Sequence, residues 1–157
     1  MEALTRLRAE IGAAVREHQR AIDAVDEATA TVLGVNRTDL RCLDLLLDVG
    51  ALAPTRLSAE LGLRSGSVTA MVDRLERLGY VTRTSDPADR RKVVIRASES
   101  AREKAEAIYG PLAEEGREAI AGYSVAELEA VLDFLRRDRA LQDEHAARIR
   151  ATDLSGR

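Results

Sequence analysis

The chain has 157 residues, of which 45% are hydrophobic and 32% charged, with one Cys and no Trp. This length supports one domain, or one domain with an oligomerisation appendage, and the scarcity of aromatic residues suits a helical core. No apolar run approaches the roughly 18 residues of a membrane helix, no secretory signal is evident, and one Cys excludes an intrachain disulfide. We therefore expect a cytoplasmic protein with no membrane partner.

Charge is distributed unevenly along the chain, although the formal net charge is only −3. Residues 63–96 contain eight basic and four acidic residues, a balance of +4, which leaves −7 for the rest. A basic region on an acidic body favours binding of a polyanion in one orientation, because phosphate contacts form locally while the body is repelled.

The first predicted helix is long and ends at Gly34. Its apolar stripe alternates spacings of three and four residues, as in a heptad repeat: Leu4, Leu7, Ile11, Ala14, His18, Ala21, Val25, Ala28 and Val32. A stripe of this length predicts packing between subunits, with packing in the core of its own chain as the alternative.

The second predicted helix begins after Asn36, with Asp39 completing a capping box, and ends at Gly50. Ala51 and Leu52 are expected to form a short strand. Pro54 then takes the first position of a third helix, where the missing N–H costs nothing.

Residues 57–97 predict two short amphipathic helices followed by two antiparallel strands. The apolar positions recur at helical spacing on both sides of Gly62, and they are Leu57, Leu61, Val68, Met71, Val72, Leu75 and Leu78. After Gly79 the period changes to two, which predicts strands at 81–84 and 92–96 around the charged loop 85–91. This pattern is typical of a helix-turn-helix with a wing.

The remaining residues predict two further helices. Ser98 caps a helix that runs to about Gly122, with a kink expected at Gly110-Pro111 because the proline ring disturbs the helical hydrogen bonds. Ser124 and Glu127 form a capping box for the last helix.

The run VTAMVDRLERLGYVTRTSDPADRRKVVIRAS, residues 68–98, resembles the MarR family of winged helix-turn-helix regulators. The resemblance rests on the helix, its "DRLE" junction with Gly-Tyr-Val and the wing sequence Asp-Pro-Ala-Asp-Arg-Arg. It implies a homodimer that places each recognition helix in a major groove and each wing near a minor groove.

The resemblance also implies the roles of particular residues. Those expected to contact DNA are Ser65, Ser67, Thr69, Ala70, Arg74, Arg90 and Arg91. Arg90 is expected to reach the minor groove, and Asp89 to orient the wing. Arg64 and Gly66 depart from the family's usual residues, which makes Ser65 the expected cap of the recognition helix.

Other chemistry is weakly indicated. His18 and His145 lie far apart without Cys or His at ligand spacing, so no metal site is expected. No glycine-rich phosphate loop or catalytic constellation is evident, and we expect neither a cofactor nor an enzyme.

A ligand site is implied between the dimer body and the winged domain. The polar or soft groups expected near it are His18, Arg16, Arg41 and Cys42, and a small organic acid or aromatic compound is the expected effector. For Cys42 the favoured alternative is a buried small hydrophobe, and for His18 it is an interface histidine with a satisfied hydrogen bond.

The sequence thus predicts a mainly α fold with a small antiparallel β wing. A winged helix-turn-helix (35–97) is expected between helical dimerisation arms (1–34 and 98–157). The predicted function is a homodimeric repressor that binds a pseudo-palindromic double-stranded DNA operator and is relieved by a small ligand. The alternative is a winged-helix module that binds proteins.

Overall fold

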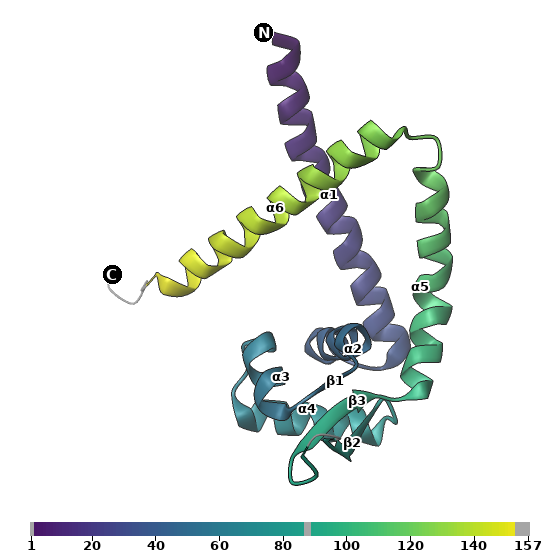
Figure 1. The fold of residues 1–157 in the computed structure, drawn as a ribbon, viewed down its shortest axis with the longest axis vertical. Coiled ribbons are helices and arrows are strands. Elements are labelled where there is room, and N and C mark those ends of the chain that lie inside the picture. Colours follow the sequence, from purple (N-terminus) through teal and green to yellow (C-terminus); the bar gives the residue numbers. More distant parts are fainter. Residues whose placement is uncertain (1, 87–88, 153–157) are drawn as a thin grey trace. The chain divides into compact units, whose positions relative to one another are not determined.

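The computed structural model describes residues 2–86 and 89–152 and is mainly helical (Figure 1). Its elements in chain order are α1 (Glu2–Leu33), α2 (Arg37–Val49), β1 (Ala51–Leu52), α3 (Pro54–Leu61), α4 (Ser65–Arg77), β2 (Val81–Ser85), β3 (Val93–Ala97), α5 (Glu99–Ala119) and α6 (Val125–Ala151). The fold class predicted from the sequence, helices with a small antiparallel wing, is confirmed.

The chain divides into two compact units, residues 1–110 and 111–157. The first contains α1, the helix-turn-helix, the sheet and the first half of α5, and the second contains the rest of α5 together with α6. The functional division at residues 34 and 97 stays a prediction.

The ends of α1 and α2 follow the signals in the sequence. Gly34 lies just after α1 with a φ of +67°, a conformation that glycine adopts without steric cost. The side chain of Asn36 accepts a 2.9 Å hydrogen bond from the Asp39 backbone N–H, and Asp39 accepts from that of Asn36. This predicted capping box fixes the N-terminus of α2. α2 is the first helix of the winged helix-turn-helix domain, residues 35–97, which is called the head below.

The three strands form an antiparallel sheet in the order β1-β3-β2. Val81 pairs with Ala97 and Ser85 with Val93, while Leu52 pairs with Ile95. The short strand predicted at Ala51 and Leu52 is therefore present and extends the wing. Two residues of the predicted wing loop, 87 and 88, lie outside the described residues.

The helix-turn-helix consists of α3 and α4. Pro54 stands at the first position of α3, as predicted, and Gly62 ends that helix in the left-handed conformation with φ +67°. The expectation that Ser65 caps α4 is wrong. Arg64 is the cap residue, with extended backbone and no side-chain cap bond, because Ser65 itself is already helical.

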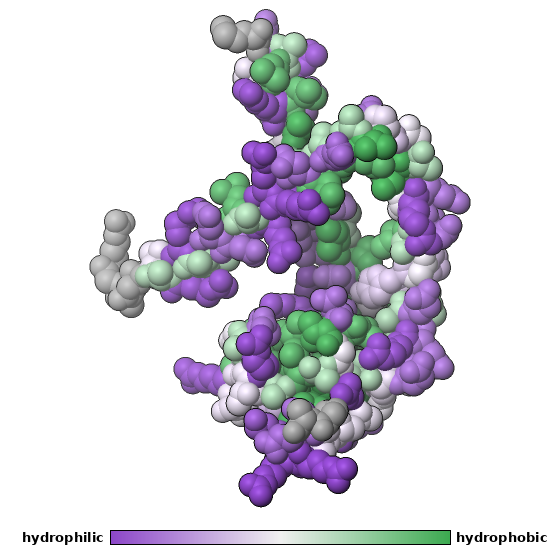
Figure 2. Space-filling model, in the orientation of Figure 1, coloured by the Kyte–Doolittle hydropathy of each residue, from purple (hydrophilic) through white to green (hydrophobic). Residues whose placement is uncertain are grey.

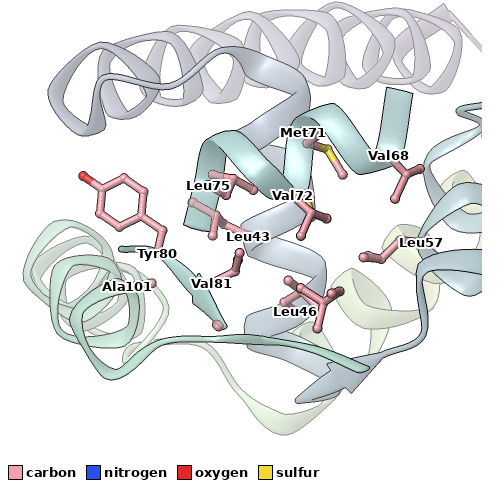
Figure 3. Packing of buried hydrophobic residues seen from close by; sticks show 13 residues of the cluster. Leu43, Leu46, Leu57, Val68, Met71, Val72, Leu75, Tyr80, Val81 and Ala101 are labelled. Carbon is pink, nitrogen blue, oxygen red and sulfur yellow. The ribbon is translucent and has the colours of Figure 1, made fainter. Parts of the chain in front are cut away.

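One hydrophobic core joins α2, α3, α4, the sheet and the start of α5 (Figure 3). Leu46 and Leu57 face Val72 and Val68 of α4 across this core, and Tyr80 lies beside Ala101 of α5. Leu46, Leu57, Leu75 and Ile95 have no exposed surface. The core leaves the opposite face of α4 open to solvent.

The two C-terminal helices match most of their predicted boundaries. The Ala101 N–H donates to Ser98 Oγ at 3.1 Å, and Ser124 and Glu127 form the predicted capping box of α6. α5 continues through Pro111, so the proline does not end the helix. It ends at Ala119, three residues before the expected Gly122.

Replacing Leu57 by Ala should lower the free energy of unfolding by about 2–5 kcal/mol, because it leaves a cavity in a closely packed core. Leu78→Ala is the matched control, since the Leu78 side chain is 43% exposed. The control should cost about 1 kcal/mol or less. Urea denaturation followed by circular dichroism measures both values, and equal losses would contradict the position of this core.

Candidate DNA interface

The outer face of α4 carries small polar side chains. The exposed residues are Ser65, Ser67, Thr69 and Ala70. The opposite face of the helix is buried in the hydrophobic core and consists of Val68, Met71, Val72 and Leu75. The Thr69 hydroxyl donates to the Ser65 carbonyl at 3.2 Å, so it lies close to its own helix. Small side chains permit close approach of this helix to base edges and phosphates.

A groove runs along each side of α4. One, of about 590 Å³, lies between α4 and the α2 N-terminus and is lined in part by Asn36, Thr38 and Ser67. The other, of about 250 Å³, lies between α3 and α4 and includes Thr55 and Thr69. α4 therefore forms a ridge between two open grooves, a shape that fits a helix inserted into a major groove with a backbone on either side.

Asp89 organises the described part of the wing turn. Its carboxylate accepts a hydrogen bond from the Arg91 backbone N–H at 3.1 Å and lies 3.6 Å from Lys92 Nζ. Its carbonyl accepts from the Lys92 N–H at 2.8 Å. These contacts hold the backbone of the turn, and the role of Asp89 in orienting the wing on DNA stays a prediction.

The wing presents two cations to solvent. Arg90 and Arg91 are both exposed, and neither side chain forms an ion pair within residues 2–86 and 89–152. Guanidinium groups that are free of internal partners can bind phosphates or enter a narrow, electronegative minor groove.

Arg74 is already engaged within the protein. Its Nε donates to Asp39 Oδ2 at 2.7 Å and its second nitrogen donates to Asp39 Oδ1, a two-point contact between α4 and α2. The Asp39 side chain has no exposed surface, and 38% of the Arg74 side chain is exposed. The hydrogen bond to Asp39 raises the pKa of Arg74 and keeps its charge in place. The predicted contact of Arg74 with DNA stays a prediction.

Arg83 joins the wing to the recognition helix. From β2 its guanidinium forms ion pairs with Asp73 and Glu76, both on α4. Asp39 and Arg83 were not among the residues predicted to form the interface. The sequence identifies Asp39 only as part of the capping box of α2. For Arg83 the only signal in the sequence is its position in a predicted strand of the wing.

The predicted ligand residues differ in burial. Cys42 is fully buried in the core, where desolvation, with a smaller effect from Asp39, raises the pKa of its thiol to about 12. The thiol is therefore protonated and unreactive at neutral pH. His18 and Arg16 are exposed on α1, and Arg41 is exposed on α2. Their part in ligand binding stays a prediction.

A polar recognition helix between two grooves, followed by a basic two-stranded turn, defines a winged helix-turn-helix protein that binds DNA. The sequence pattern of the MarR family matches residues 33–92. The chain is also 36% identical over 124 residues to YcgE, an HTH-type transcriptional regulator of Bacillus subtilis, covering 79% of this chain and 80% of YcgE. This protein belongs to the MarR family of transcriptional regulators, whose members bind DNA and are not enzymes.

Solved structures agree with this fold. A MarR family protein from Bacillus stearothermophilus is 25% identical, with a TM-score of 0.62 over 90% of this chain and 96% of that one. The apo form of MarR from Escherichia coli has a TM-score of 0.56 at 19% identity, over 80% of this chain and 93% of that one, and shows the fold alone.

Within the described residues no group of three or more His, Cys, Asp and Glu side chains could hold a metal ion. No described helix is long and apolar enough to cross a membrane.

Arg90→Ala should weaken operator binding by on the order of 1–3 kcal/mol and leave the unfolding free energy unchanged, because the side chain is exposed and unpaired. The control is Arg137→Ala on α6, which removes an exposed cation that lies outside the winged domain and pairs with Asp133 of its own helix. Gel-shift titrations of both variants measure the effect. Equal affinity of Arg90→Ala and the unsubstituted protein would remove Arg90 from the interface.

The contact between Arg74 and Asp39 can be tested by a double-mutant cycle. Arg74→Ala should lower stability by up to about 3 kcal/mol, the low end expected for breaking a buried ion pair, because Arg74 is partly exposed. If Arg74 acts only by holding α4, then Arg74→Ala, Asp39→Ala and the double variant should weaken operator binding to similar extents. If Arg74 contacts DNA directly, the two losses should add.

Proposed function

We propose that the protein acts in the cytoplasm as a homodimeric repressor, which binds a pseudo-palindromic operator and is released from it by a small ligand. The observation that carries the proposal is the apolar stripe of α1, which is exposed within the unit formed by residues 1–110. Each protomer also has one recognition helix, α4, and one wing, which suffice for one half of a palindromic site. A two-fold partner supplies the second pair and reads the other half-site.

The exposed apolar side chains of α1 support a partner of the same kind. Leu4 and Leu7 are each 53% exposed, and Ile11 and Val25 are exposed as well. Figure 2 shows hydrophobic residues on the N-terminal part of this helix. Further large apolar side chains of residues 111–157 are exposed within their own unit, including Leu132, Leu135 and Leu141. Burial of such surfaces is the usual driving force for association.

A dimer bound to its operator would repress transcription by occupying that segment of DNA. Two heads spaced by roughly 34 Å, one helical turn of DNA, would read both half-sites and exclude other proteins from that segment. A ligand that favours a different spacing releases the operator, and it can do so only through unequal affinity for the two geometries. By linkage, a ligand that weakens operator binding tenfold binds the operator complex tenfold more weakly.

Selection of genomic fragments by the purified protein, followed by sequencing, tests the proposed operator. We expect recovery of a site with two inverted halves, and transcription in vitro from a promoter that overlaps it should fall when the protein is added. Recovery of random fragments would contradict sequence-specific binding, and increased transcription would contradict repression.

Salt dependence separates DNA binding from the alternative, a winged-helix surface that binds proteins. A complex dominated by phosphate contacts weakens steeply with salt. We expect such a steep slope with the selected fragment, and a flat one would favour the alternative.

Replacing Leu7 and Ile11 by Asp should abolish the dimer, because four negative charges would be desolvated at the two-fold interface. Ala9→Asp with Ala13→Asp is the control, since it adds the same charge at the same spacing on the side of α1 that faces away from Leu7 and Ile11. Sedimentation velocity should show monomer or unfolded chain for the first variant and dimer for the control. A stable dimer of the first variant would exclude this stripe from the interface.

A further inference from the structure

An apolar cleft lies where the head meets α5, and it belongs wholly to the unit formed by residues 1–110. It is lined by the end of α1, one face of α2, Tyr80 and the first half of α5. The lining residues are Leu33, Leu40, Leu43, Asp44, Leu47, Tyr80, Ala101, Ala105, Ile108 and Tyr109. Apolar and aromatic walls with very few polar groups are typical of sites for small organic molecules.

The cleft is narrow in this structure. Only about 10 Å³ of space between its walls would admit a water molecule. The Tyr80 hydroxyl donates to the Leu33 carbonyl at 3.0 Å, which ties the residue before β2 to the end of α1. A ligand can therefore enter only by moving α5 or the end of α1 relative to the head.

One charged side chain lines this cleft, the carboxylate of Asp44. Asp44 is also exposed, so its carboxylate lies both on the cleft wall and in contact with solvent. It forms no hydrogen bond or ion pair within residues 2–86 and 89–152. Because this carboxylate is the charged group among the lining residues, the cleft favours a ligand that carries a positive charge.

Charged groups on the surrounding elements also act on the cleft, and they include one cation, Lys104 of α5, whose Nζ lies 6.0 Å from the centroid of the Tyr80 ring. Partial desolvation, and then the negative charge of Asp26 on α1, raise the pKa of Asp44. Burial raises the pKa of Tyr109 on α5, and the charges of Asp44 and Asp26 contribute to that rise while Thr29 opposes it. The nearby cation Arg37 is already bound to Asp23 at 2.9 Å and to Asp26 at 3.6 Å.

We propose that this cleft binds a hydrophobic amine, whose apolar body lies among the leucines and tyrosines while its ammonium group pairs with Asp44. The inference rests on the proposed function, because it names the chemical class of the releasing ligand. An ammonium group satisfies the unpaired carboxylate and reduces its repulsion with Asp26. A carboxylate ligand of the same shape gains the same apolar contacts but is repelled by Asp44.

The position of the cleft connects binding to release of DNA. Tyr80 directly follows the α4–Gly79 turn and precedes β2, so a body inserted beside it acts on the segment between recognition helix and wing. The ligand and the operator then bind most tightly to different arrangements of that segment. This difference in affinity is what allows the ligand to release the protein from DNA.

The test compares two probes of matched shape, 4-phenylbutylamine and 4-phenylbutanoate, by isothermal titration calorimetry on the intact protein. We expect the amine to bind at least tenfold more tightly than the acid. Asp44→Asn should reduce amine affinity at least tenfold and should not weaken the acid. Asp48→Asn is the matched control, because Asp48 is exposed one turn further along α2 and does not line the cleft.

A second variant locates the site. Ala105→Leu adds volume inside the cleft without changing charge, and it should weaken amine binding in a protein that remains folded by circular dichroism. Amine binding that is indifferent to both Asp44→Asn and Ala105→Leu, or tighter binding of the acid, would overturn the proposal.

Gel shifts of the selected operator, made on the same variants without probe, separate this inference from the proposed function. Intact operator binding without amine binding would refute only the ligand assignment. Absence of operator binding in the unsubstituted protein would refute the proposed function itself. Amine binding that leaves operator affinity unchanged would refute the role in release.

Discussion

A buried carboxylate governs how the recognition helix is held. Asp39 closes the capping box of α2 and receives two hydrogen bonds from Arg74 of α4, although it is completely shielded from solvent. An unpaired charge in that position is costly, so every folded arrangement must bring the guanidinium to it. This requirement fixes α4 against α2 at the one point where the apolar core, which is nondirectional, would permit rotation or sliding.

Once α4 is fixed, the charges of the head separate into two groups. Arg74 and Arg83 are bound to internal acids, so they set the positions of the helix and of strand β2. Arg90 and Arg91 on the wing have no internal ion pair among the described residues. Counting basic residues therefore overstates the charge available to DNA, since half of these four arginines are neutralised within the protein.

Local signals predicted the elements well, because caps, glycines and apolar periods act over a few residues. Asn36, Pro54, Gly62 and Gly79 each stand where the structure ends or begins an element. The pairing of Asp39 with Arg74 spans 35 residues and leaves no periodic trace, so it could not be predicted. Family resemblance assigned Arg74 to DNA by its helical face, which does not reveal an internal partner.

The same limitation explains the ligand site. The family resemblance suggested that Arg16, His18 and Arg41 lie near a cleft that binds an anion, but it could not show which charges line the walls. In the structure these three side chains are exposed, and the charge at the cleft is Asp44. Apolar walls alone would accept an amine and an acid of equal shape alike. The single carboxylate among the lining residues makes the choice, because it attracts an ammonium group and repels another carboxylate.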